Sequence, residues 1–167
     1  MNVLATFDGS AFSEETLPLL LQIGALPSAR FTLLRVGHEP HGRGRRGRRL
    51  PVVAGASLGQ AAMIVIPSGE PKFAETKGQA IDRELAEIED YLLGVAKKLG
   101  PEANVHVEAH ISDDAARTII ERAQAEQPDV IVMATHSRRG LAALFGSTTE
   151  QVVRSSVAPV LLVHPQK

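Results

Sequence analysis

Residues 128–163, PDVIVMATHSRRGLAALFGSTTEQVVRSSVAPVLLV, contain the pattern that decides the fold. The apolar run at 129–134 is typical of a central strand in a parallel sheet, because both faces of such a strand are buried. A loop with Gly and Arg follows at 135–145, then a predicted helix from about 147 to 155 and a second apolar strand at 159–163. Strand, helix and strand in this order predict a parallel sheet with crossover helices.

The same alternation is found in the rest of the chain. We predict further strands at 2–6, 30–36 and 105–109, and helices that begin near Ser13, Thr76 and Ser112. Five strands with helical connections and right-handed crossovers predict an α/β fold. The simplest arrangement is an open, doubly wound five-stranded parallel sheet of order 3-2-1-4-5, with helices on both faces.

Length and composition predict a single domain over 1–167, with a variable basic loop at about 38–75. Hydrophobic residues make up 44% of the chain but aromatic residues only 4%, so the core must be mostly aliphatic. The absence of cysteine excludes disulfides, thiolate metal sites and a cysteine nucleophile. We see no secretory leader and no apolar run of roughly 18 residues, and therefore expect no membrane span and a cytoplasmic location.

The basic loop carries five arginines in one short segment: Arg43, Arg45, Arg46, Arg48 and Arg49. The formal net charge of the chain is −1, so the rest of the molecule carries about −6. The segment has no interleaved aromatic residues and no nucleic-acid module surrounds it, so we interpret it as a solvated loop and expect no nucleic-acid partner. The apolar run at 61–66 fits an extra strand, a ligand cover, a dimer contact or core.

The sequence shows no pair of general base and nucleophile, and we predict no catalytic residue. Asp113 and Asp114 are interpreted as helix caps. His106 and His110 share one face of a strand, but they are well apart and no third ligand is evident, so we interpret them as solvent-facing and predict no metal site.

The candidate binding residues follow the first and fourth strands, since open parallel sheets bind ligands beyond the carboxyl ends of their strands. Asp8 offers an acceptor for a ribose hydroxyl or an adenine amine. The segment 146–148 opens a helix whose N–H groups and dipole favour a phosphate, and Arg138 and Arg139 supply charged donors. A plain helix cap at 146–148 and a plain turn at Asp8 are the alternatives. His136 fits either a ligand contact or a bond to backbone.

Together, residues 3–18 (VLATFDGSAFSEETLP), 31–36 (FTLLRV) and 128–163 resemble the universal stress protein family. The resemblance implies that Asp8 contacts a nucleotide and that Val36 offers backbone contacts to adenine. It also implies a homodimer paired through the last strand, Pro159–Val163, and a role in stress response or signalling. The implied ligand is ATP, or AMP or ADP, with Mg²⁺ accompanying a triphosphate.

The phosphate-binding pattern of nucleotide-binding members is Gly-x2-Gly-x9-Gly-Ser/Thr. Ala134 and Ser137 stand at the first two glycine positions, and Gly146-Ser147 matches the last pair with a spacing one residue short. The predicted nucleotide-binding set is Thr6, Phe7, Asp8, Val36, Ala134, His136, Ser137, Arg138, Arg139, Gly140, Gly146, Ser147 and Thr148. Two alternatives stay open, a nucleotide-free interaction protein of the same fold and a slow ATP-hydrolysing enzyme.

The last strand is apolar and is expected at an edge of the sheet, where bare backbone and apolar side chains invite aggregation. A symmetric dimer would cover it. The alternative is a short edge strand shielded by the tail, 164–167.

Overall fold

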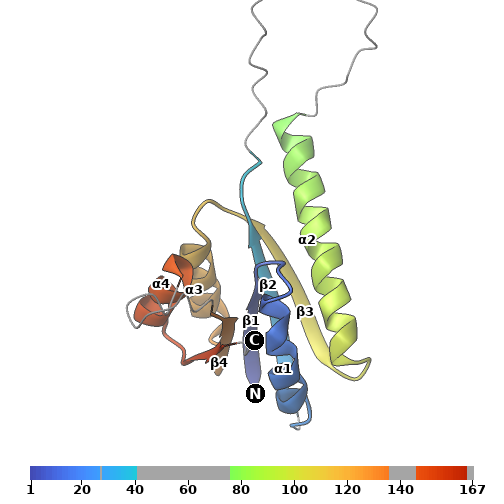
Figure 1. The fold of residues 1–167 in the computed structure, drawn as a ribbon, viewed down its shortest axis with the longest axis vertical. Coiled ribbons are helices and arrows are strands. Elements are labelled where there is room, and N and C mark those ends of the chain that lie inside the picture. Colours follow the sequence, from blue (N-terminus) through green and yellow to red (C-terminus); the bar gives the residue numbers. More distant parts are fainter. Residues whose placement is uncertain (27, 41–75, 136–145, 165–167) are drawn as a thin grey trace, which may run out of the picture.

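The computed structural model describes residues 1–26, 28–40, 76–135 and 146–164 (Figure 1). Its five strands are all parallel and lie in the order β3-β2-β1-β4-β5, so the predicted α/β fold and strand order are confirmed. The strands are β1 (Asn2–Phe7), β2 (Arg30–Gly37), β3 (Asn104–Ile111), β4 (Val130–Ala134) and β5 (Val160–Val163). The helices are α1 (Leu17–Gly24), α2 (Lys77–Leu99), α3 (Ala115–Glu126) and α4 (Ser147–Ser155), with a short 3₁₀ turn, η1 (Ser13–Thr16). The arginine segment 43–49 and the apolar run 61–66 lie outside the described residues.

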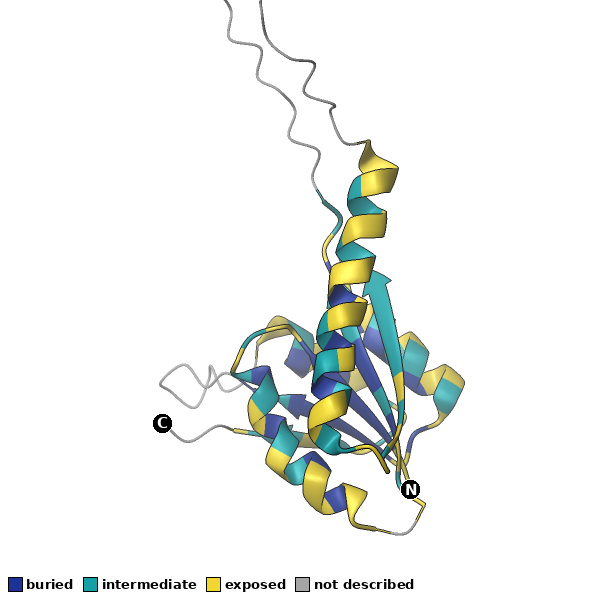
Figure 2. Cartoon of the chain, turned by 90° about the vertical axis from the view of Figure 1, so that its right-hand side faces the viewer, coloured by how far each residue is buried: buried dark blue, intermediate teal, exposed yellow. Residues whose placement is uncertain are grey.

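The central strands are apolar on both faces because helices cover both sides of the sheet (Figure 2). Successive side chains of a strand point to opposite faces. Val3, Ala5 and Phe7 of β1 accordingly pack on the side of α1 and α2. Leu4 of the same strand packs on the side of α3 and α4. The uninterrupted apolar runs in the sequence are the consequence of this double burial.

The helix boundaries follow their local signals. Thr76 caps α2 in a reciprocal capping box with Gln79, and Gly100, with φ of 98°, ends the helix. The Asp114 carboxylate accepts the Arg117 N–H at 3.0 Å and caps α3. The predicted helix from Ser13 is instead a 3₁₀ turn followed by α1, because Pro18 has no N–H and suits only the first turn of a new helix.

Two elements differ from prediction in extent or burial. Strand β3 is longer than the predicted 105–109, because its pairing with β2 runs from Arg30↔Asn104 to Gly37↔Ile111. In α2, Ile81, Leu85 and Ile88 share one face by their helical spacing, but only Ile88 is buried and the other two are half-buried. The first turns of α2 extend beyond the ends of the strands (Figures 1 and 2). Neither Ile81 nor Leu85 is among the side chains that pack on the core beneath α2.

The close approach of α2 to the end of β2 depends on Gly37. A Cβ atom at this position would lie 2.6 Å from Cδ1 of Ile88 and 3.0 Å from Cδ1 of Ile111. The first separation is far below van der Waals contact, so the missing side chain allows the helix to lie directly on the strand end.

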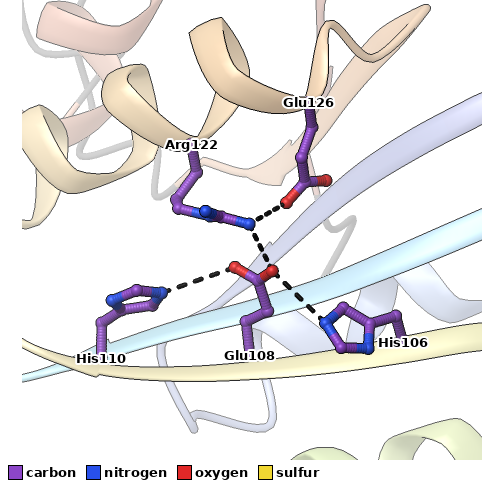
Figure 3. A network of polar contacts seen from close by, with 5 residues as sticks. All are labelled: His106, Glu108, His110, Arg122 and Glu126. Atoms are coloured by element: carbon purple, nitrogen blue, oxygen red, sulfur yellow. Dashed lines mark hydrogen bonds and ion pairs between the residues drawn. The ribbon is translucent and has the colours of Figure 1, made fainter.

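Edge strand β3 is tied to α3 by a polar network around Glu108 (Figure 3). Arg122 of α3 donates to the Glu108 carboxylate and also to Glu126 one helical turn further on, at 2.6 Å. The Nε2 atoms of His106 and His110 each lie 3.4 Å from a Glu108 oxygen. The Glu108 side chain is only 13% exposed, so Arg122 is the partner that compensates a largely buried charge.

The close packing at Gly37 predicts opposite effects for two glycine-to-alanine substitutions. Gly37→Ala should lower the free energy of unfolding by about 1–3 kcal/mol, because Ile88 must be displaced. Gly94→Ala, inside α2 with no atom within 4 Å of the new Cβ, should raise it by up to about 1 kcal/mol through helix propensity. Urea unfolding followed by circular dichroism measures both. Equal effects of the two changes would contradict the steric argument.

The Glu108 network predicts a pH-dependent contribution to stability. Burial raises the pKa of Glu108, but the hydrogen bond and charge of Arg122 outweigh it, and the net pKa lies below the ordinary value. The stabilisation is therefore present above the unfolded-state pKa, near 4.3, and is lost as the pH falls through the lower folded-state pKa. Arg122→Met should cost about 1–3 kcal/mol at pH 7, and its difference from wild type should shrink at about pH 3.

Urea unfolding of both proteins at the two pH values makes this measurement. Arg117→Met is the matched control on the same helix, because Arg117 pairs with Glu121 at the surface and should contribute little at either pH. A difference for Arg122→Met that does not change with pH would show that lost packing, and not the ion pair, is responsible.

Candidate functional site

A cavity of about 520 Å³ opens at the carboxyl ends of β1, β2 and β4. The structure brings eight of the predicted site residues to its wall: Thr6, Phe7, Asp8, Val36, Ala134, Gly146, Ser147 and Thr148. The other five predicted residues lie outside the described part of the chain: His136, Ser137, Arg138, Arg139 and Gly140. Apolar side chains from both sides of the strand ends, including Leu34, Ile119 and Met133, complete the wall.

The cavity exists because β1 ends before its neighbour. The last β1–β2 pair is Phe7↔Arg35, whereas β2 continues to pair with β3 as far as Gly37↔Ile111. The Gly37 carbonyl accepts the Ser112 N–H on the β3 side, at 2.9 Å. Because carbonyls alternate along a strand, the Val36 carbonyl faces the opposite side, where the register places no β1 residue. Val36 therefore presents a backbone acceptor at the cavity.

The turn after β1 holds the Asp8 carboxylate in place. Its Oδ1 accepts hydrogen bonds from the backbone N–H and the hydroxyl of Ser10, at 2.8 and 2.6 Å. The Ser10 hydroxyl oxygen in turn accepts the Ser13 N–H at 3.2 Å. Asp8 and Gly9 thus lie in a turn, and the same turn carries the Asp8 carboxylate to the cavity wall.

Arg35 lies beneath this turn and was not among the predicted site residues. Its Cζ lies 4.8 Å from the centre of the Tyr91 ring, in a cation–π contact, and Tyr91 meets Phe7 edge to face. A Cβ at Gly9, whose φ is 84°, would fall 2.4 Å from that Cζ atom. A side chain at position 9 is therefore disfavoured twice, by the backbone conformation and by the guanidinium packed against this position. Burial is the main cause that raises the pKa of the Tyr91 phenol.

The N-terminus of α4 forms another part of the wall. Gly146 is the N-cap residue in an extended conformation, and no side chain makes a capping hydrogen bond there. The first N–H groups of a helix have no partner within the helix and carry partial positive charge. No described atom lies within 4 Å of the position that a Cβ at Gly146 would take, so the approach to these groups is open.

The further cavity residues that escaped prediction include three with polar side chains, Ser13, His38 and Glu84. The sequence pattern at Ser13 predicts only the start of a helix. Glu84 lies on α2, and helical periodicity alone does not reveal that its side chain reaches the cavity wall. The sequence signal for Arg35 was a single charge inside the apolar strand FTLLRV.

Two histidines outside the cavity, His106 and His110, lie on β3. His106 is 71% exposed and His110 is 38% exposed, and both contact Glu108. Within the described residues, no three His, Asp or Glu side chains are grouped in a way that would hold a metal ion. Among the helices described, none has the length and apolar character to cross a membrane.

The architecture is shared with solved structures across nearly the whole chain. The hypothetical protein MJ0577 superposes with a TM-score of 0.70 over 99% of this chain and 96% of its own, at 20% identity. A universal stress protein in complex with cAMP gives a TM-score of 0.59 at 18% identity, covering 98% and 96% of the two chains. One from Archaeoglobus fulgidus in complex with dAMP gives 0.54 at 14% identity, covering 96% and 94%.

Sequence comparison assigns the family. Universal stress protein MJ0531 of Methanocaldococcus jannaschii is 32% identical over 96 residues, so the chain spans about half of that relative, 56% of each. The sequence model of the universal stress protein family matches residues 1–164. With that match and the confirmed strand order, this chain belongs to the universal stress protein family.

Proposed function

We propose that this chain is a cytoplasmic universal stress protein module that binds ATP, or the related AMP or ADP, and acts in stress response or signalling as a homodimer. The observation that carries the proposal is the convergence of three groups on one cavity. They are the Val36 carbonyl, the Asp8 carboxylate and the N-terminus of α4. The cavity volume of about 520 Å³ lies within the range typical of small-molecule sites.

Each group suits a different part of an adenine nucleotide. The apolar wall that includes Leu34 and Met133 suits the faces of the base, and the Val36 carbonyl can accept from its amine. Asp8 can accept from a ribose hydroxyl. The N–H groups at the start of α4 suit the phosphates, and Mg²⁺ would neutralise part of the charge of a triphosphate. The cAMP and dAMP complexes of two structural neighbours support an adenine nucleotide as the ligand.

The nucleotide-free alternative rests on the departures from the glycine pattern. Ala134 stands at the first glycine position, at the end of β4, and lines the cavity. Its methyl group is small enough for a ligand to approach, as glycine would be. The shortened spacing falls at 138–145, outside the described residues, so the test must be made on the protein itself.

The first test analyses the protein as purified, without added ligand. After heat denaturation, mass spectrometry of the supernatant should find stoichiometric adenine nucleotide for wild type and little for Asp8→Ala or Gly146→Val. The first variant removes the acceptor, and the second places a branched side chain in the open approach to α4. A mixture of ATP with ADP or AMP would indicate hydrolysis. Circular dichroism checks that both variants fold.

An empty cavity calls for a second measurement. At a ligand concentration 100 times its Kd, ATP should stabilise wild type by about 2.7 kcal/mol and raise its melting temperature. No shift at millimolar ATP, together with no nucleotide in the purified protein, would reject the proposal in favour of the nucleotide-free alternative.

The homodimer part of the proposal is supported by an exposed apolar strip near the β5 edge. Strand β5 pairs with β4 on one side only, and the predicted dimer segment Pro159–Val163 contains it. Val153, Val157 and Leu161 are 44%, 66% and 41% exposed. An apolar edge strand of this kind is stabilised when a second copy covers it.

A charge on this strip should therefore convert the dimer to a monomer. We expect Leu161→Lys to do so because a buried, unpaired ammonium is costly, and sedimentation equilibrium measures the mass. Leu93→Lys is the matched control, since Leu93 is 43% exposed on α2 and should leave the dimer intact. A wild-type protein that sediments as a monomer would refute the homodimer part of the proposal and would leave the nucleotide-binding part unaffected.

A further inference from the structure

A carboxylate on α2 lies at the cavity wall beside the end of β2. Glu84 lines the cavity together with Val36 and Gly37. Its Oε1 lies 3.5 Å from the position that a Cβ at Gly37 would occupy. The Glu84 carboxylate therefore lies within van der Waals distance of the end of β2.

Glu84 is half-buried, and among the described residues it makes no hydrogen bond and no ion pair. Its neighbours on α2 are different, since Arg83 pairs with Glu87 at 2.8 Å on the outer surface. Arg35 also lines the cavity, but it packs against Tyr91 and Gly9 and forms no ion pair with Glu84. A partly buried carboxylate without a partner is costly unless a ligand supplies the donor.

The cavity thus holds two acceptors at one end, the Glu84 carboxylate and the Val36 carbonyl. A carboxylate and a carbonyl accept hydrogen bonds and donate none. The ligand group that satisfies two acceptors is a donor with two N–H bonds, such as the exocyclic amine of a purine. A carbonyl oxygen at the same position would face both acceptors with its lone pairs.

We propose that Glu84 is a specificity-determining residue that selects a 6-aminopurine over a 6-oxopurine. This inference rests on the proposed function, because it assumes that the base of a nucleotide lies at this end of the cavity. One N–H of the amine is donated to Val36 and the other to Glu84. Adenine nucleotides then bind more tightly than their inosine counterparts, which carry an oxygen in place of the amine and a hydrogen on the neighbouring N1 atom.

The test compares ATP with ITP by isothermal titration calorimetry on the full chain. Wild type should bind ATP about tenfold to hundredfold more tightly than ITP, as is usual for the loss of a hydrogen bond to a charged group. Glu84→Gln should reduce that ratio by about tenfold, since its amide N–H can donate to the inosine carbonyl. Glu84→Ala should reduce it as well, through weaker ATP binding. Glu87→Gln, one turn away on the exposed surface, is the matched control and should keep the wild-type ratio.

The outcomes separate the two proposals. Wild-type discrimination that persists in both Glu84 variants would overturn the role of Glu84 and leave nucleotide binding intact. Equal loss of ATP and ITP affinity in Glu84→Gln, with the ratio unchanged, would also overturn it. A wild type that binds neither nucleotide would refute the proposed function and this inference with it. Melting curves without ligand confirm that each variant is folded.

Discussion

The unequal length of neighbouring strands is the constraint on which the candidate site depends. Strand β1 lies at the centre of the sheet, and its pairing with β2 stops at Phe7↔Arg35 while β2 and β3 continue together. Helix α1, which follows β1, packs on one face of the sheet, and α4 packs on the other. Among the described residues, no strand continues the pairing of β2 beyond the end of β1. The Val36 carbonyl, a polar turn and a helix N-terminus then meet at this point, and none of the three is unusual by itself.

Side chains far apart in the chain complete this end of the sheet. The guanidinium of Arg35 is held between the Tyr91 ring and the backbone of Gly9, which links β2, α2 and the turn after β1. Gly37 brings α2 onto the end of β2, and that helix places Glu84 at the cavity wall. The polar walls of the site therefore depend on how closely these elements pack. Gly37 leaves room for Ile88 of α2, and Gly9 leaves room for the guanidinium of Arg35.

Sequence reasoning succeeded where the signal is local. Alternating apolar runs predicted the strands, and caps such as Asp114 marked the helix starts. The motif residues Asp8 and Gly146 both line the cavity, Asp8 after the end of β1 and Gly146 at the start of α4. No local signal separates the missed residues, Arg35 and Glu84, from surface charges, because a charged residue in a strand or on a helix looks the same whether it faces solvent or a cavity.

The sequence by itself thus determined the class of fold, the positions of most strands and helices and the edge of the sheet at which the cavity opens. These depend on periodicities of two and 3.6 residues and on capping chemistry, which neighbouring residues decide. Only the tertiary structure decided which charges share a cavity, how far β3 extends and why Ile81 and Leu85 stay half-buried. Those outcomes depend on distances between elements, and such distances are set by packing contacts between residues remote in the chain.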